Sequence, residues 1–310
     1  MKKNGSTLTE MKQNSILVTG GTGFFGCSLL DMIARGNWKE YRFTMLSRRA
    51  QEFSRLHPEY AALSNVEFLA ADVRELAGCN RQFQYIIHAA TPAVDSPDDA
   101  ELHDIIVSGT KTVLDFARGS GAEKLLYISS GGVYGSGTQP FKETDTCTPL
   151  TVYGKAKLEA ENLVLTSDIP AVIMRAFAFA GKHLRRDVHF AFGNFLADAL
   201  AGRDIIIKGD GTPLRSYMHS DDLAMWLMTM LLSGRNGTIY NCGSDHAVSI
   251  KILAEKINSV LNPDGKITVS TPAAPGAKIS CYVPDIARAK LELNLNLTID
   301  LETAIKLSVG

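Results

Sequence analysis

The sequence has little cysteine and no excess of charge of either sign. Its five cysteines are scattered, and no two of them form a Cys-x-x-Cys pair. A sparse, odd and dispersed set argues against a disulfide framework or a structural zinc site, and it favours reduced thiols in a cytoplasmic protein. The formal net charge is −1, so no overall attraction draws the chain to nucleic acid or to an anionic membrane. We therefore expect neither of these partners and no metal.

Long hydrophobic runs are also missing. The longest apolar stretch, Leu223–Leu232, is interrupted by Thr229 and is shorter than the roughly 20 residues that span a bilayer. Residues 1–14 are polar and lack the apolar core of a signal peptide, so we expect a loose, disordered tail there. The chain has 310 residues, of which 45% are hydrophobic. It can therefore bury the core of one large domain or of two modest ones.

Apolar strands alternate with helices from residue 15 onward. The first pair is the strand Ser15–Gly21 and the helix Phe24–Arg35, and the alternation continues to the strand Ala171–Phe177. This rhythm predicts an α/β fold, a doubly wound parallel sheet of the Rossmann type covered by helices on both faces. We expect a dinucleotide-binding domain over residues 15–180. The rhythm then changes, so residues 181–310 are expected to form mainly a smaller C-terminal substrate-binding part, from which elements can return to the main sheet.

A glycine-rich turn joins the first strand to the first helix. The segment reads Thr-Gly-Gly-Thr-Gly-Phe-Phe-Gly over residues 19–26 and fits both G-x-G-x-x-G and G-x-x-G-x-x-G. Glycines let a backbone approach a pyrophosphate closely, and the start of a helix offers free N–H groups. A glycine turn without a ligand is the alternative, which the position between strand and helix disfavours. The predicted cofactor-binding residues here are Gly20, Gly23, Phe24, Phe25 and Gly26.

The second strand ends without the acidic residue that often binds the ribose of NAD. Arg48 follows Ser47 there instead, and an arginine suits the 2′-phosphate of NADP. We therefore expect NADP(H) to be preferred, with Arg48 as a contact. The alternative is that the arginine merely starts a solvated helix and that NAD(H) binds. Asp72 and Val73, after the third strand, are candidates for the adenine contact, although Asp72 suits a helix cap equally well.

Tyr153 and Lys157 stand four residues apart on a predicted helix, so both lie on one face. A phenol titrates near pH 10, and we expect the nearby ammonium to lower that pKa and make Tyr153 a general acid or base. Lys157 is also expected to hold the nicotinamide ribose. A chance pair on a helix surface is the alternative. Ser130, at the end of the preceding strand, is placed to hydrogen-bond the reacting oxygen.

With these motifs in place, the chain resembles the extended short-chain dehydrogenase/reductase family, which includes nucleotide-sugar epimerases, dehydratases and reductases. The matching segments run in family order over most of the chain. They are Thr19–Gly26, His88–Ala90, Ser129–Gly135, Tyr153–Lys157, Gly209–Gly211 and Arg215–Asp222.

The resemblance implies roles for further residues. Ala89 and Ala90 are expected at the cofactor, and Ser130 takes the position of the catalytic serine, where it also contacts substrate. Arg215 is similar to the arginine that holds a nucleotide diphosphate, and Asn194 is similar to a substrate-contacting residue. A surface cation and a helix-start cap are the respective alternatives. The resemblance also implies a homodimer joined through the helices of residues 98–118 and 151–166.

The reaction that the resemblance implies is hydride transfer to or from a nucleotide-linked sugar. Sugar 4,6-dehydratases resemble one another in an Asp-Glu pair after the serine position, where this chain has Gly131 and Gly132. A dehydratase is therefore disfavoured unless Glu143 or Asp145 substitutes. Arg48 favours an NADPH-dependent reductase of a 4-keto-6-deoxy sugar nucleotide. A 4-epimerase that recycles NAD is the main alternative, and a non-catalytic NADP-binding regulator is a further one.

Overall fold

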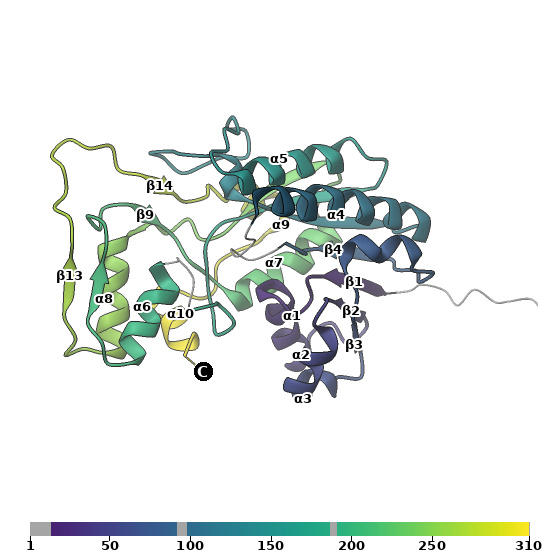
Figure 1. The fold of residues 1–310 in the computed structure, drawn as a ribbon, viewed down its shortest axis with the longest axis horizontal. Coiled ribbons are helices and arrows are strands. Elements are labelled where there is room, and N and C mark those ends of the chain that lie inside the picture. Colours follow the sequence, from purple (N-terminus) through teal and green to yellow (C-terminus); the bar gives the residue numbers. More distant parts are fainter. Residues whose placement is uncertain (1–13, 92–97, 187–190, 310) are drawn as a thin grey trace, which may run out of the picture.

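A computed structural model describes residues 14–91, 98–186 and 191–309. Its central sheet has seven strands in the order β11-β6-β5-β4-β1-β2-β3, and every neighbouring pair is parallel. The predicted doubly wound α/β fold is confirmed (Figure 1). The strands of this sheet are β1 (Ser15–Thr19), β2 (Arg42–Leu46), β3 (Val66–Leu69), β4 (Tyr85–His88), β5 (Lys124–Ser130), β6 (Ala171–Ala176) and β11 (Thr238–Cys242).

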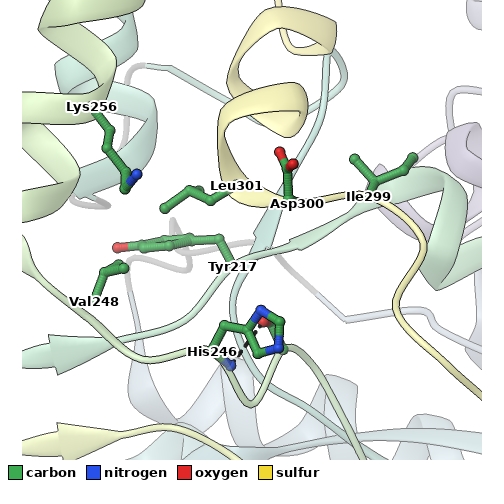
Figure 2. Close-up of a pocket in the computed structure, with 8 residues that line it drawn as sticks. Tyr217, His246, Val248, Lys256, Ile299, Asp300 and Leu301 are labelled. Atoms are coloured by element: carbon green, nitrogen blue, oxygen red, sulfur yellow. Dashed lines mark hydrogen bonds between the residues drawn. The ribbon is translucent and has the colours of Figure 1, made fainter.

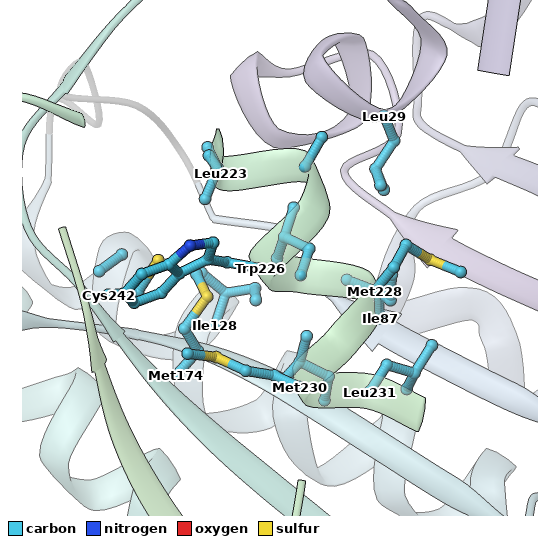
Figure 3. Packing of buried hydrophobic residues seen from close by; sticks show 14 of the residues in the cluster. Leu29, Ile87, Ile128, Met174, Leu223, Trp226, Met228, Met230, Leu231 and Cys242 are labelled. Atoms are coloured by element: carbon cyan, nitrogen blue, oxygen red, sulfur yellow. The ribbon is translucent and has the colours of Figure 1, made fainter. Parts of the chain in front are cut away.

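Helices cover both faces of this sheet because successive residues of a strand point to opposite sides. Ile16 and Val18 of β1 pack into the cluster formed with α1 (Phe24–Ala34) and α7 (Ser220–Ser233). Leu17 faces the other cluster, formed with α4 (Asp99–Ser120) and α5 (Val152–Leu165). Figure 3 shows α7 on the first face, with Trp226 and Met230 packed toward the strands.

The remaining part of the chain holds a separate apolar cluster and three small sheets. Helices α6 (Ala191–Leu200), α8 (Ile250–Leu261) and α10 (Leu301–Leu307) pack around Phe192, Ile257 and Ile305. The small sheets are β7 (Phe179–Ala180) with β10 (Met218–His219), β8 (Ile205–Ile207) with β13 (Ile267–Val269), and β9 (Leu214–Arg215) between β12 (Val248–Ser249) and β14 (Cys281–Tyr282). The further helices are α2 (Ala50–Leu56), α3 (Pro58–Ala61), η1 (Val73–Gly78), η2 (Gly131–Val133) and α9 (Ala287–Leu293).

Two features of the fold place the site. The strand order reverses between β1 and β4, so the carboxyl ends of these strands border a crevice, which is where open α/β sheets bind their ligands. Strand β14 runs parallel to β9 and pairs Tyr282 with Arg215, which brings a distant segment to the same edge. The boundary near residue 181 stays a prediction, since β11 joins β6 in the main sheet and α7 packs on α1.

No helix among the described residues is long and apolar enough to cross a membrane. The five cysteines all lie in the described part of the chain and are free thiols. The same residues contain no cluster of three or more His, Cys, Asp or Glu side chains suited to a metal ion. Residues 1–13 of the predicted tail lie outside the described residues.

Candidate active site

The glycine-rich turn lies against the end of β4. Gly20 has a φ of +71°, and a Cβ there would lie 2.8 Å from the carbonyl oxygen of Ala89. Glycine is thus the residue that this left-handed conformation and close approach require. A Cβ on Gly26 would lie 2.1 Å from the carbonyl oxygen of Gly21. Because only bare backbone fits, the turn and the start of α1 offer N–H groups that suit a dinucleotide pyrophosphate.

The phenylalanines that open α1 are set by packing against the second half of the chain. The rings of Phe24 and Phe25 meet edge to face, with centroids 6.0 Å apart. Both also contact Phe179 of β7, at 5.8 and 5.7 Å. The backbone of both residues is therefore held at the helix start, where the sequence predicts the cofactor. Ala90 donates its N–H to Thr19 Oγ1 at 3.2 Å and closes this side of the crevice.

The end of β2 is fastened to the same turn. Thr22 donates its hydroxyl to Ser47 Oγ at 2.7 Å, so the next residue, Arg48, begins beside the glycine turn. Arg48 is exposed, and it forms no ion pair with any of the residues that the structure describes. Its guanidinium is therefore available to an anionic ligand.

The third strand is followed by a helix cap. The Asp72 carboxylate accepts the N–H of Arg74, and the two side chains also pair at 3.0 Å. The hydrogen bond from the Arg74 side chain is the main cause of the lowered pKa of Asp72. The cap predicted as the alternative for Asp72 is thus present, and the side chain of Val73 is buried in the core. The adenine contact of both residues stays a prediction.

Tyr153 and Lys157 lie on one face of α5, with the ammonium nitrogen 5.9 Å from the centre of the phenol ring. Lys157 is 3% exposed, and its Nζ donates to the Ile128 carbonyl and to Thr91 Oγ1, both at 2.7 Å. Burial lowers the pKa of Lys157 to about 7, against an opposing effect of Glu161. Burial also raises the pKa of Tyr153. The expectation that the ammonium lowers the phenol pKa is therefore wrong for this geometry, in which desolvation dominates.

Ser130 lies at the end of β5, beside Tyr153. Its Oγ accepts the N–H of Gly132 at 3.0 Å and so caps the short helix η2. A hydrogen bond with the Ser130 side chain opposes the rise in the pKa of Tyr153 that burial causes. The structure thus brings together the three residues that the sequence predicts as catalytic.

Sequence reasoning missed Tyr282 at this site. Its ring lies 4.9 Å from the ring of Phe177, and its hydroxyl would lie 2.9 Å from a Cβ on Gly131. Burial raises its pKa, and a hydrogen bond with the Ser130 side chain opposes that rise. No local motif marks Tyr282, because only the pairing of β14 with β9 brings it here.

A buried ion pair between Glu161 and Arg175 joins the catalytic helix α5 to strand β6. Glu161, one turn beyond Lys157, receives two hydrogen bonds from Arg175, at 3.0 and 2.7 Å. Ser129 donates a third, at 2.5 Å. Both charged side chains are at most 4% exposed. Because Arg175 and Ser129 hold the Glu161 carboxylate, it is not free to pair with Lys157.

The two residues predicted to contact substrate lie in the second half of the chain. Asn194 is half-buried and is the fourth residue of α6. Residues 187–190, just before this helix, lie outside the described residues. Arg215 is also half-buried, donates to its neighbour's carbonyl, Leu214 O, at 2.7 Å, and lies 5.8 Å from the centre of the Tyr282 ring. Within the described residues no carboxylate pairs with Arg215, so it remains available to a phosphate.

A cavity of about 190 Å³ lies apart from these residues, between β12, α8 and the start of α10. Figure 2 shows Tyr217, Lys256 and Asp300 among the side chains around it. None of the residues predicted from the sequence lines it. The cavity is therefore not the site assembled at the edge of the main sheet.

The sequence pattern of the NAD dependent epimerase/dehydratase family matches residues 16–243. The chain belongs to this family. The family resemblance inferred from the sequence is thereby confirmed, and the chain is assigned to a family of NAD-dependent enzymes.

Curated relatives agree with this assignment. UDP-glucuronic acid decarboxylase 6 of Arabidopsis thaliana is 28% identical over 94% of this chain and 87% of its own. UDP-N-acetyl-alpha-D-glucosaminuronate decarboxylase of Bacillus cytotoxicus is 26% identical over 81% of each chain. Among solved structures, UDP-glucose 4-epimerase of Thermotoga maritima superimposes with a TM-score of 0.82 at 21% identity, covering 95% of this chain and 97% of its own. At that identity the likeness supports the fold alone.

Proposed function

We propose that this protein reduces a nucleotide-linked 4-keto-6-deoxy sugar with NADPH. The curated relatives are named for nucleotide sugars, and the site holds the phenol, hydroxyl and ammonium that a proton transfer coupled to hydride transfer requires. NADPH supplies the hydride when it is bound. The preference for a reductase rests on one observation, the exposed Arg48 in the position where NAD sites often carry an acid.

Each residue of the site has a separate role in the proposed reaction. The N–H groups at Phe24 and Phe25 hold the pyrophosphate, and Arg48 holds the 2′-phosphate. Tyr153 gives its phenolic proton to the sugar oxygen as the ketone becomes an alcohol, and the Ser130 hydroxyl orients that oxygen. Lys157 turns its ammonium toward the ribose of the bound dinucleotide. The positive charge of this ammonium then lies beside the Tyr153 phenol.

Arg215 and Asn194 are assigned to the nucleotide sugar. A half-buried guanidinium without a carboxylate partner among the described residues suits a diphosphate, since arginine binds phosphate in a forked geometry. Arg215 stands beside Tyr282 and thus faces the same edge of the sheet as Ser130. We keep a homodimer through α4 and α5 and a cytoplasmic location as expectations.

A 4,6-dehydratase fits this site poorly. Gly131 and Gly132 offer no acid or base, and the carboxylates of Glu143 and Asp145 each accept a backbone N–H. Glu143 accepts the N–H of Asn241 at 2.9 Å, and Asp145 accepts the N–H of Lys142 at 2.8 Å. These hydrogen bonds fix both carboxylates to the backbone, which weighs against either one substituting for the missing pair.

The test measures the nicotinamide and the sugar together. Purified protein is incubated with NADPH and a dTDP- or UDP-linked 4-keto-6-deoxyhexose, and nicotinamide absorbance is followed while the sugar is analysed by mass spectrometry. We expect stoichiometric loss of NADPH and a product heavier by two hydrogens. Interconversion of a UDP-hexose without net loss of nicotinamide would instead identify a 4-epimerase. Formation of a 4-keto-6-deoxy sugar from dTDP-glucose would overturn the role assigned to the glycine pair.

A further inference from the structure

A second phenol, that of Tyr282, lies beside the catalytic serine. Tyr282 comes from β14, far along the chain from Ser130, and its ring contacts Phe177 at 4.9 Å and the Arg215 guanidinium at 5.8 Å. These two contacts fix the position of the ring and so of its hydroxyl. That place is next to Gly131, where a Cβ would come within 2.9 Å of the Tyr282 oxygen.

The glycine at position 131 is what makes this approach possible. A side chain there would also meet the Phe177 ring at 2.8 Å, so it would have to displace Phe177, Tyr282 or both. The space that a side chain after the serine would fill is therefore occupied in part by the Tyr282 hydroxyl, which comes from a distant strand.

The hydrogen-bond capacity of Ser130 defines what Tyr282 does there. A serine hydroxyl has one donor and two acceptor positions, and one acceptor is taken by the Gly132 N–H at 3.0 Å. The phenols of Tyr153 and Tyr282 both lie next to the Ser130 side chain, so they can use the remaining donor and the remaining acceptor. Burial raises the pKa of Tyr282, so it stays protonated and donates. In the ligand-free protein, in which no sugar oxygen competes for it, the Ser130 proton is then left to point at the Tyr153 oxygen.

We infer that Tyr282 is a positioning residue whose hydroxyl, lodged beside Gly131, directs the Ser130 proton toward the Tyr153 oxygen. The inference rests on the proposed role of Ser130 and Tyr153 in proton transfer. A hydrogen bond donated to the phenolate form favours ionisation, so Tyr282 makes the Tyr153 proton easier to release.

The charged and titratable groups around the two phenols come from three elements and one turn. Lys157 and Glu161 lie on α5, Tyr127 on β5, Arg215 on β9, and Tyr134 directly after η2. None of them is altered when only the Tyr282 hydroxyl is removed. The variant Tyr282→Phe keeps the ring, its contact with Phe177 and its place under Arg215, so it isolates the hydroxyl.

The first test is a double-mutant cycle on turnover of the nucleotide sugar, with Tyr282→Phe, Ser130→Ala and the double variant. We expect Tyr282→Phe to lower kcat by about tenfold with little change in KM, since a hydrogen bond to a developing charge has that effect. In the Ser130→Ala background the same change should alter kcat by less than about twofold, because its target is gone. Effects that simply multiply would overturn the inference.

Two further variants separate positioning from packing. Tyr134→Phe also removes a buried phenol hydroxyl, which donates to Asn241 at 2.8 Å, and it serves as the matched control. The limb of the pH–rate profile set by Tyr153 should move to higher pH in Tyr282→Phe and stay in place in Tyr134→Phe. Gly131→Ala keeps the Tyr282 hydroxyl but displaces it, so its profile should move in the same direction as that of Tyr282→Phe. Equal profiles for Tyr282→Phe and wild type would contradict the inference.

The second test needs no substrate. The nine tyrosines are labelled with ¹³C at the phenol carbon, and the Tyr153 signal is assigned as the one missing from Tyr153→Phe. On alkaline titration of the ligand-free protein, ionisation of Tyr153 should begin about one pH unit higher in Tyr282→Phe than in wild type. An unchanged titration overturns the inference. If wild type converts no nucleotide sugar, the proposed function fails, but this titration still decides the role of Tyr282.

Discussion

Lys157 is buried with its proton poorly solvated, and this makes the stability of the ligand-free protein depend on pH. Its pKa in the folded protein is about 7, against an ordinary value of 10.5. Between these two values the unfolded chain binds more protons at this site than the folded chain does. Stability therefore rises with pH across this window. The full difference corresponds to about 5 kcal/mol, at 1.36 kcal/mol for each pH unit between the two values.

The perturbation that tests this is Lys157→Met, which keeps an unbranched side chain one atom shorter and removes the charge. The variant also leaves the Ile128 carbonyl and Thr91 hydroxyl without the ammonium that now bonds them at 2.7 Å. That loss costs roughly 1–3 kcal/mol but does not depend on pH. The difference between wild type and variant, followed with pH, therefore isolates the ammonium.

The assay is urea unfolding of wild type and Lys157→Met at pH 7 and pH 9. Relative to the variant, wild type should gain about 2 kcal/mol of unfolding free energy over this interval. Lys155→Met is the matched control, because Lys155 is exposed on the same helix and should show no such gain. Stability curves for wild type and Lys157→Met that stay parallel with pH would refute the reasoning.

Three other changes have outcomes that follow from the site. Arg48→Ala should narrow the ratio of NADP to NAD affinity measured by calorimetry, and equal affinities in the unmodified protein would remove the reason for proposing NADPH. Tyr153→Phe should lower turnover by about two to four orders of magnitude with dinucleotide affinity nearly unchanged; retention of more than about a tenth of the activity would mean that another group moves the proton. Glu161→Gln should lower the free energy of unfolding by about 3–5 kcal/mol in denaturant, because it leaves the buried Arg175 charge unpaired. A loss below about 1 kcal/mol would show that the pair contributes little.

The parts of the site that the sequence predicts are those formed by residues close together in the chain. A glycine turn needs only its own glycines and the strand and helix on either side, and the spacing of Tyr153 and Lys157 on a helix is fixed by the helical repeat. The doubly wound parallel sheet followed in the same way from the alternation of apolar runs. The element ends shifted by a residue or two; the first strand, predicted to end at Gly21, ends at Thr19.

The parts that escaped prediction depend on pairings between distant segments. Strands of two residues, such as β9 and β14, carry no periodicity that a sequence pattern can detect. Tyr282 therefore could not be recognised as a neighbour of Ser130. The direction of the pKa shift at Tyr153 failed for a related reason: the spacing along α5 gives the distance to Lys157 but not the burial of both groups, and burial is the larger effect.

The catalytic helix carries a phenol, an ammonium and a carboxylate at successive turns of one face, and the structure assigns each a different electrostatic environment. Glu161 would hold Lys157 firmly charged if it were free, but its oxygens are bonded by Arg175 and Ser129. Among the described residues, the ammonium instead has the Ile128 carbonyl and the Thr91 hydroxyl as its hydrogen-bond partners, and burial lowers its pKa to about 7. An ammonium in this state gains much from a new polar partner, because each added hydrogen bond offsets its desolvation. The ribose hydroxyls of a dinucleotide would be such a partner, which couples cofactor binding to the charge beside Tyr153.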